Sequence, residues 1–320
     1  MNKIFTIAKN TFIETLRQPI YAILIHAALF LFIISPSLAM YTMDDDNKLL
    51  REIGLSTLFL TSLFIAIFSS SGAVAEELRN KTIMTVLTKP VQRPIFIISK
   101  FLGVAAAVVL AHYICTVALL MTIRHGVLET VNDTHDWAVL GAAILSLAAT
   151  YLLSAFFNYA YDWKFSSTAV VLIGLFATIS IVFLSFIDRD WQFNPQKNGL
   201  NAVDIYGSVL LLLAAIIIVA LAVALSARFN IVVTLAVCIG IFLLGLVSDY
   251  VFGRYADTHL WARIGRFLVP NLQIFWISDA IYEGSKVPLK YIAMSASYAL
   301  CYTGAILALA IALFQRRQVG

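Results

Sequence analysis

Residues 101–123, FLGVAAAVVLAHYICTVALLMTI, contain no Asp, Glu, Lys or Arg. At about 1.5 Å per residue, a helix of this length crosses the roughly 30 Å hydrocarbon core of a bilayer. The stretch lacks the strict alternation of polar and apolar residues that is typical of a strand in a membrane barrel. Because lipid offers no hydrogen-bond partner to exposed backbone groups, we predict a transmembrane helix here.

The rest of the chain has the same character. Of its 320 residues, 61% are hydrophobic and 12% are charged, whereas a soluble domain is about half apolar and a quarter charged. We therefore predict an all-α integral membrane protein, a polytopic helical bundle in which residues 1–320 form a single domain. The apolar runs predict about eight spans, at 20–40, 53–75, 101–123, 138–160, 167–187, 205–226, 229–250 and 291–313.

The loops between these spans differ in charge. Those on one side of the membrane are rich in Lys and Arg, and those on the other side are acidic or mixed, as in YTMDDDNKLLRE at 41–52. By the positive-inside rule the basic side is cytoplasmic, so both termini are expected in the cytoplasm. If the hairpin around the turn at 161–166 did not cross, six spans would remain and neither terminus would move.

Residues 1–18 carry apolar side chains at helical spacing between basic ones, and they contain no evident cleavage site for a signal peptide. We predict an interfacial amphipathic helix that leads into the first span.

Several classes of function lack their usual sequence signals. The central parts of the spans contain no acidic or basic residue except His26 and His112, whereas carriers driven by protons or sodium generally need charged groups at this depth. The zinc, phosphate-loop and nucleophile-elbow motifs of common enzymes are missing as well. We therefore expect neither an enzyme nor a metal site, and we expect no nucleic acid among the partners.

Residues 76–100, EELRNKTIMTVLTKPVQRPIFIISK, concentrate charge in a chain that has little of it. An amphipathic helix is expected over 75–87, and Pro90 would end it. A second helix should begin near Pro94 and continue into the next span. Such a pair of helices would present a charged knob to a soluble partner on the cytoplasmic side, although an ordinary positive-inside loop has the same composition.

The order of residues in EELRNKTIMTVLTKPVQRPIFIISKFLG, residues 76–103, closely resembles the signature of ABC-2 type transporter permeases. Lys81 stands where many members have Gly. The resemblance extends over essentially the whole chain, because the N-terminal segment resembles the connecting helix of this family and the final FQRRQ resembles its basic end. The signature positions are Glu77, Thr82, Leu87, Pro90, Arg93 and Lys100. By this resemblance, these residues and the neighbouring Glu76 and Arg79 are expected to couple the chain to an ATPase.

The resemblance implies the membrane half of an ATP-driven transporter that exports an unidentified substrate across a bacterial inner membrane. A separate cytoplasmic ABC ATPase would bind ATP and Mg, so this chain would hold no cofactor, and a second permease chain, identical or different, would complete the unit. Glu77 and Arg79 would contact the ATPase, Thr82 would pack inside the coupling element, and Pro90 and Arg93 would set its exit angle. Pairing of Glu77 with Arg93 or Lys100 is an equally open interpretation.

Two other functions remain open from the sequence. The chain could be a membrane scaffold or assembly subunit that binds an ATPase without moving cargo, or a carrier that works without ATP.

The extracytoplasmic segment at 253–290 combines aromatic residues with Arg and Lys. That combination favours interfacial re-entrant helices in contact with membrane lipid over a simple surface loop. The candidates for an extracytoplasmic gate are Trp261, Phe267, Phe275 and Trp276.

Overall fold

The computed structural model describes residues 3–40, 46–76, 92–128, 133–282 and 286–315. Within these residues the regular structure is helical, and only an isolated bridge between Ile187 and Phe193 pairs two extended segments. The predicted all-α membrane fold is therefore confirmed.

Seven helices among the described residues are long and apolar enough to cross a membrane. Seven of the eight predicted spans coincide with them, so these predictions are confirmed. The helices are α2 (Pro19–Ala39), α3 (Asp46–Ser70), α6 (Arg93–His125), α7 (Trp137–Tyr161), α8 (Phe165–Phe186), α9 (Ala202–Ser226) and α14 (Leu289–Gln315). Ser71–Glu76 extend α3 as a π-helical segment, η1.

The eighth span, predicted at 229–250, is broken. Helix α10 (Ile231–Leu246) has 16 residues, and the chain bends by 68° into Ser248–Tyr255. The backbone carbonyl of Gly245 accepts a hydrogen bond from the amide of Leu272 at 3.0 Å. A Cβ at Gly245 would lie 2.8 Å from the carbonyl oxygen of Pro270, so only glycine allows this approach. A contact with a distant segment therefore ends the helix early.

The core of the bundle lies among α3, α6 and α9, where large apolar side chains such as Leu58, Ile114 and Ile218 are fully buried. In contrast, α2, α7 and α14 bury less than a third of their apolar windows. Since lipid tails are as apolar as these side chains, close packing and interhelical hydrogen bonds hold such helices together.

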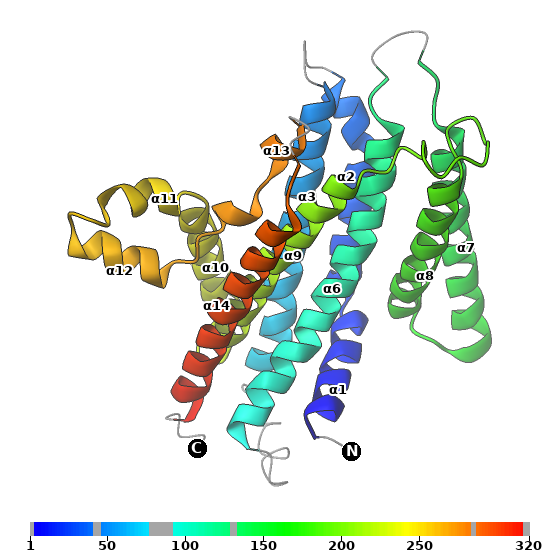
Figure 1. Cartoon of the computed structure of the whole chain (residues 1–320). Helices are drawn as coiled ribbons and strands as arrows, with labels where there is room; N and C mark the ends of the chain where they lie inside the picture. Colours follow the sequence, from blue (N-terminus) through cyan, green and yellow to red (C-terminus); the bar gives the residue numbers. More distant parts are fainter. Residues whose placement is uncertain (1–2, 41–45, 77–91, 129–132, 283–285, 316–320) are drawn as a thin grey trace.

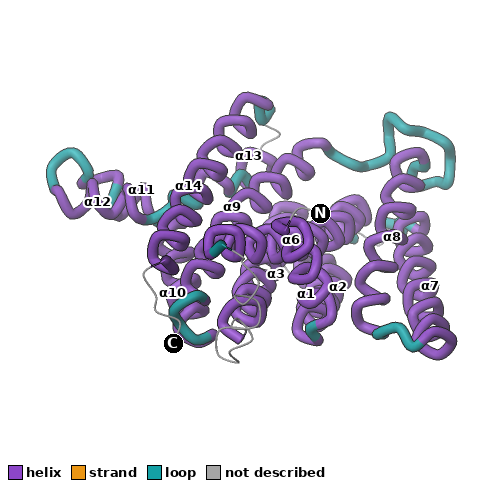
Figure 2. The backbone as a smooth tube through the Cα atoms, turned by 90° about the horizontal axis from the view of Figure 1, so that it is seen from below, coloured by secondary structure: helices purple, strands orange, loops and turns teal. Residues whose placement is uncertain are grey.

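Helices α7 and α8 form a hairpin at one side of the bundle in both views (Figures 1 and 2), and Val170 and Ile173 of α8 belong to the main core. The two helices pack on each other, and Ser146 and Ser180 share a hydrogen bond of 2.6 Å between them. Figure 1 shows that α1 (Lys3–Arg17) begins and α14 ends at the same end of the bundle. We call this end the terminal end, and the opposite end, where α6 ends and α7 begins, the loop end.

Between α10 and α14 the chain forms short helices instead of an irregular loop. They are α11 (Ser248–Val251), η2 (Gly253–Tyr255), α12 (Leu260–Leu268), η3 (Gln273–Phe275) and α13 (Ser278–Tyr282). Helices α11 and α12 project sideways from the bundle (Figures 1 and 2).

Candidate functional site

The terminal end is built on the crossing of α1 and α6. A Cβ at Gly103 would lie 2.6 Å from both the carbonyl oxygen of Ala8 and the Cβ of Thr11, so the two helices approach too closely for any larger residue at this position. Thr11, Thr15 and Leu16 are buried on the same side of α1. Helix α1 therefore packs firmly against the first half of α6.

Lys100, one of the predicted coupling residues, lies inside this end. Its exposed fraction is 3%, and its Nζ lies 5.7 Å from the centroid of the Phe96 ring, within the range of a cation–π interaction. Phe96 stacks in turn on Phe314 of α14, with ring centroids 5.9 Å apart. Lys100 thus belongs to the contact between α6 and α14 and does not form part of an exposed charged surface.

Arg93 is the first residue of α6, and the structure places Pro94 in the first turn of that helix. The predicted restart of the helix is confirmed. The half-buried Arg93 lies about two turns before Lys100 on the same helix. The two residues therefore lie on the same side of α6, about 10 Å apart along its axis.

The rest of the predicted coupling set falls at or beyond the edge of the described residues. Glu76 is the last residue of η1, and the others lie outside the described residues: Glu77, Arg79, Thr82, Leu87 and Pro90. The amphipathic helix expected over 75–87 and the roles of these residues therefore stay predictions. Both ends of the segment are nevertheless fixed, because η1 continues α3 and α6 begins at Arg93.

A buried polar cluster joins α3, α6 and α9 in the middle of the bundle. His112 Nδ1 lies 2.8 Å from Ser62 Oγ, and its Nε2 lies 2.9 Å from the carbonyl oxygen of Ser208. His26 Nδ1 lies 2.7 Å from the carbonyl oxygen of Ala22 in its own helix. The two intramembrane histidines thus have partners within the protein, and His112 serves as a hydrogen-bonding link between three helices.

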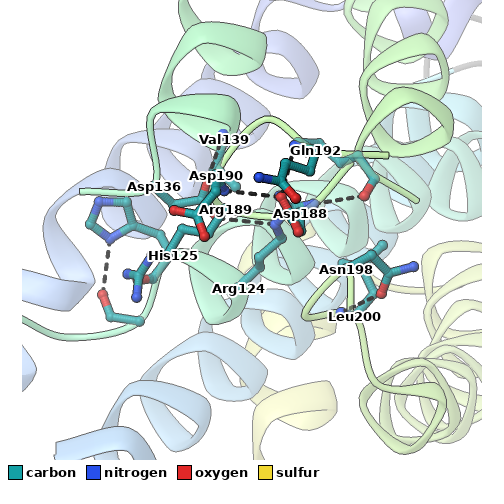
Figure 3. Close-up of polar contacts among 12 residues, drawn as sticks. Arg124, His125, Asp136, Val139, Asp188, Arg189, Asp190, Gln192, Asn198 and Leu200 are labelled. Carbon is teal, nitrogen blue, oxygen red and sulfur yellow. Dashed lines mark hydrogen bonds and ion pairs between the residues drawn. The ribbon is translucent and has the colours of Figure 1, made fainter. Parts of the chain in front are cut away.

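At the loop end an ion pair is buried, a feature that our sequence analysis missed (Figure 3). Arg124 Nε donates to Asp136 Oδ2 at 3.0 Å, and both side chains are 2% exposed. Arg124 Nη1 donates to the carbonyl oxygen of Leu184 at 2.6 Å. Asp136 Oδ1 also accepts the amide of Val139 at 3.1 Å and caps α7. The pair therefore ties the end of α6 to the start of α7 and the end of α8. The signal in the sequence was an arginine at the end of one span and an aspartate just before the next.

The loop between α8 and α9 folds over this pair. Arg189 Nη2 donates to the carbonyl oxygen of His125 at 3.0 Å, and Asp188 Oδ1 accepts the amides of Asp190 and Gln192 at 3.0 and 2.9 Å. Figure 3 shows these groups around Arg124.

A second pair, Arg51 with Asp204 at 3.2 Å, joins α3 and α9. No group of three metal-ligating side chains occurs in the searched residues, which are the described ones.

The four candidate gate residues fall into two groups. Trp261 and Phe267 lie on α12 and are 54% and 83% exposed, whereas Phe275 is 1% exposed. Trp276 packs beside Phe275 against the main core. Two of the four residues thus lie on the projecting helix α12 and two lie in the bundle. The structure does not bring the four together around one opening.

A comparison with protein families relates the chain to known proteins. A model of the family described as ABC-2 family transporter protein matches residues 16–233, from the end of α1 to the start of α10. The match covers about two thirds of the chain. A search of curated proteins found no match.

Proposed function

The chain belongs to the ABC-2 family of transporter proteins, and from this premise we propose that it is the membrane permease subunit of an ATP-driven exporter. The ATP would be bound and hydrolysed by a separate cytoplasmic ABC ATPase. A second permease chain would complete the transporter.

The observation that carries this proposal is the arrangement of helices at the terminal end. Helix α1 is packed on α6 at Gly103, and α6 is packed on α14 through Phe96 and Phe314. Segment 77–91 connects η1 to the start of α6. A partner that binds this segment could therefore move α3 and α6. These helices also form the most deeply buried part of the bundle.

The polar groups inside the bundle support an ATP-driven mechanism over an ion-driven one. A carrier driven by ions needs a charged or strongly polar group that exchanges its partner during transport. In the described part of the spans, the buried His112 bonds to Ser62 and Ser208. The buried carboxylates are each paired with an arginine, Asp136 with Arg124 and Asp204 with Arg51. The energy for transport would therefore enter from the ATPase through segment 76–100.

The proposal is tested by isolating the tagged chain from its own membrane in mild detergent. We expect an ATPase with a phosphate-loop motif to accompany it and to hydrolyse ATP. Glu77→Ala combined with Arg93→Ala should reduce the amount of bound ATPase at least several-fold. Arg228→Ala is the matched control, since Arg228 is an exposed cation of the turn between α9 and α10 and should leave ATPase binding unchanged.

The same preparation separates the alternatives. In sealed vesicles, export that requires ATP and the ATPase supports the proposal. Transport by vesicles without the ATPase would overturn it in favour of an ATP-independent carrier. Bound ATPase whose activity responds to no cargo, together with an absence of ATP-dependent transport, would favour the scaffold.

A further inference from the structure

A cavity lies between the α7–α8 hairpin and the main bundle. It encloses about 350 Å³ and is lined by α2, α6, α7 and α8, a volume within the usual range of small-molecule sites. Most of the lining is apolar, with Phe32 and Ile33 from α2, Ile114 and Met121 from α6, Leu147 from α7 and Ile173 from α8. Lining residues follow one another at helical spacing along α2, α6 and α7, so the cavity runs lengthwise between the helices.

Different groups lie at the two ends of this cavity. Beyond Leu29 and Thr150, the rings of His26 and Tyr151 meet with centroids 5.9 Å apart and connect α2 to α7. At the loop end, His125 and His135 line the cavity, and the buried pair of Arg124 and Asp136 holds the hairpin to α6. The hairpin is thus held to α2 by the contact of His26 with Tyr151 and to α6 by the pair of Arg124 and Asp136. The cavity lies between these two contacts.

Aromatic side chains indicate that the cavity lies at the depth of the lipid tails. Trp137 and Trp191 are exposed near the loop end of the hairpin, and Tyr161 and Trp163 are exposed at its turn. Trp and Tyr gather at the two interfaces of a membrane. Between these two belts α7 and α8 expose large apolar residues such as Leu145, Leu152 and Ile179, as expected of a surface that faces lipid.

Polar groups are few in the cavity, and the accessible ones lie at its loop end. Ser146 and Ser180 bond to each other, and the fully buried Thr150 has no hydrogen-bond partner for its Oγ1 among the residues that the structure describes. At the loop end, His125 Nε2 lies 3.3 Å from His135 Nδ1, and His125 Nδ1 lies 3.0 Å from the carbonyl oxygen of Gly126. If His125 donates to that carbonyl and His135 donates to His125, Nε2 of the exposed His135 is left to face a ligand.

We propose that this cavity binds a membrane phospholipid, with an acyl chain along α2, α6, α7 and α8 and the headgroup at the His125–His135 pair. The long apolar lining fits the chain. With Nδ1 engaged by His125, Nε2 of His135 donates to a phosphate oxygen in the imidazolium form of the ring, in which both nitrogens carry a proton. Arg189 lies beside His125 and favours an anionic headgroup, while Asp136 is engaged by Arg124 and Asp188 by backbone amides. This inference does not depend on the proposed ATP-driven export.

The proposal is tested with the full chain in vesicles of phosphatidylethanolamine and phosphatidylglycerol, a fraction of which carries a diazirine on one acyl chain. After illumination, we expect cross-links to concentrate on residues that line the cavity, such as Leu147 and Ile173. Ala143 lines the cavity, and Ala143→Trp should lower cross-linking at these positions at least fivefold. The matched control is Ala148→Trp, because Ala148 is an exposed position of α7 that does not line the cavity; it should leave the cross-links unchanged.

A second pair of variants tests the headgroup. His125→Ala with His135→Ala should weaken retention of the labelled lipid roughly twofold to tenfold, the effect of about one lost hydrogen bond. Cross-links spread evenly over outward positions such as Leu145 and Leu152, with no enrichment in the cavity, would overturn the proposal and indicate annular lipid only. Because this distribution is measured in the wild-type chain, the test stands even if a filling variant fails to fold. Unchanged cavity cross-links in a folded Ala143→Trp chain would overturn it as well.

Discussion

A single hydrogen atom at position 103 sets how closely α1 and α6 can approach. We expect Gly103→Ala to force the helices apart, because its Cβ would lie 2.6 Å from the carbonyl oxygen of Ala8. Overpacking of this kind costs about 1–3 kcal/mol, so the midpoint of thermal unfolding in detergent should fall. If the crossing transmits force from the ATPase, ATP hydrolysis coupled to cargo should fall too.

Gly304→Ala is the control for this prediction. Among the described residues, no atom outside its own helix lies within 4 Å of a Cβ at Gly304, and alanine is the better helix former by about 1 kcal/mol. We expect an unchanged or slightly higher midpoint. Equal losses in both variants would show that the α1–α6 crossing has no special requirement for glycine.

The buried pair of Arg124 and Asp136 gives the second prediction at this scale. Asp136→Asn keeps a side chain that can cap α7 but removes the charge that compensates Arg124. Leaving one charge of a buried pair uncompensated costs about 3–5 kcal/mol, so the unfolding midpoint should drop sharply. Asp257→Asn is the control, because Asp257 is exposed and a surface change of this kind stays within about 0.5 kcal/mol. Similar midpoints for the two variants would contradict a stabilising role for the pair.

At the scale of elements, the helices could be predicted because their backbone hydrogen bonds are local and their apolar length is visible in the sequence. The break after α10 could not be predicted, because it depends on Leu272 binding the carbonyl of Gly245 from 27 residues further along. The pair of Arg51 and Asp204 was missed for the same reason, since 153 residues separate its members. In the candidate coupling site, the sequence predicted the helix start at Arg93, but it gave no sign that Lys100 would be buried against Phe96.

Helix α12 carries the prediction at this scale. Its large apolar residues share one face and are exposed, and Ala262 is its buried residue. We expect this face to enter the membrane interface, as sequence analysis predicted for this segment. Amide hydrogen exchange over 260–268 should therefore be slower in lipid nanodiscs than in detergent. Phe267→Glu should remove that protection, because burial of a phenylalanine contributes about 1.5–3 kcal/mol and a carboxylate opposes it.

Arg266→Gln serves as the control on the opposite face of α12. Arg266 is 58% exposed and lies 3.8 Å from Asp249, and an exposed pair of this kind contributes at most about 1 kcal/mol. Protection in nanodiscs should persist in this variant. Equal exchange of the wild-type helix in nanodiscs and in detergent would show that α12 lies in water.

At the scale of the whole molecule, charge is distributed along the bundle in a way that predicts its orientation. The α7–α8 turn at the terminal end carries Lys164, and the α9–α10 turn at the same end carries Arg228. The loop between α8 and α9, at the other end, carries two acidic residues, Asp188 and Asp190, beside Arg189 and Lys197. Lys3 and Lys9 of α1 and Arg93 at the start of α6 add to the basic residues of the terminal end. By the positive-inside rule we therefore expect the terminal end to face the cytoplasm. We then expect the hairpin to cross the membrane twice and to place its turn inside the cell.

Single cysteines at the two ends of α8 test this orientation and the crossing of the hairpin together. Lys164 and Gln196 are both exposed, and Cys115, Cys238 and Cys301 would first be replaced by alanine. With an impermeant maleimide on intact cells, we expect Gln196→Cys to react and Lys164→Cys to react only after permeabilisation. Reaction at Lys164→Cys alone would mean the reverse orientation. Reaction at both positions in intact cells would mean that α7 and α8 do not cross, and would leave a bundle of six spans.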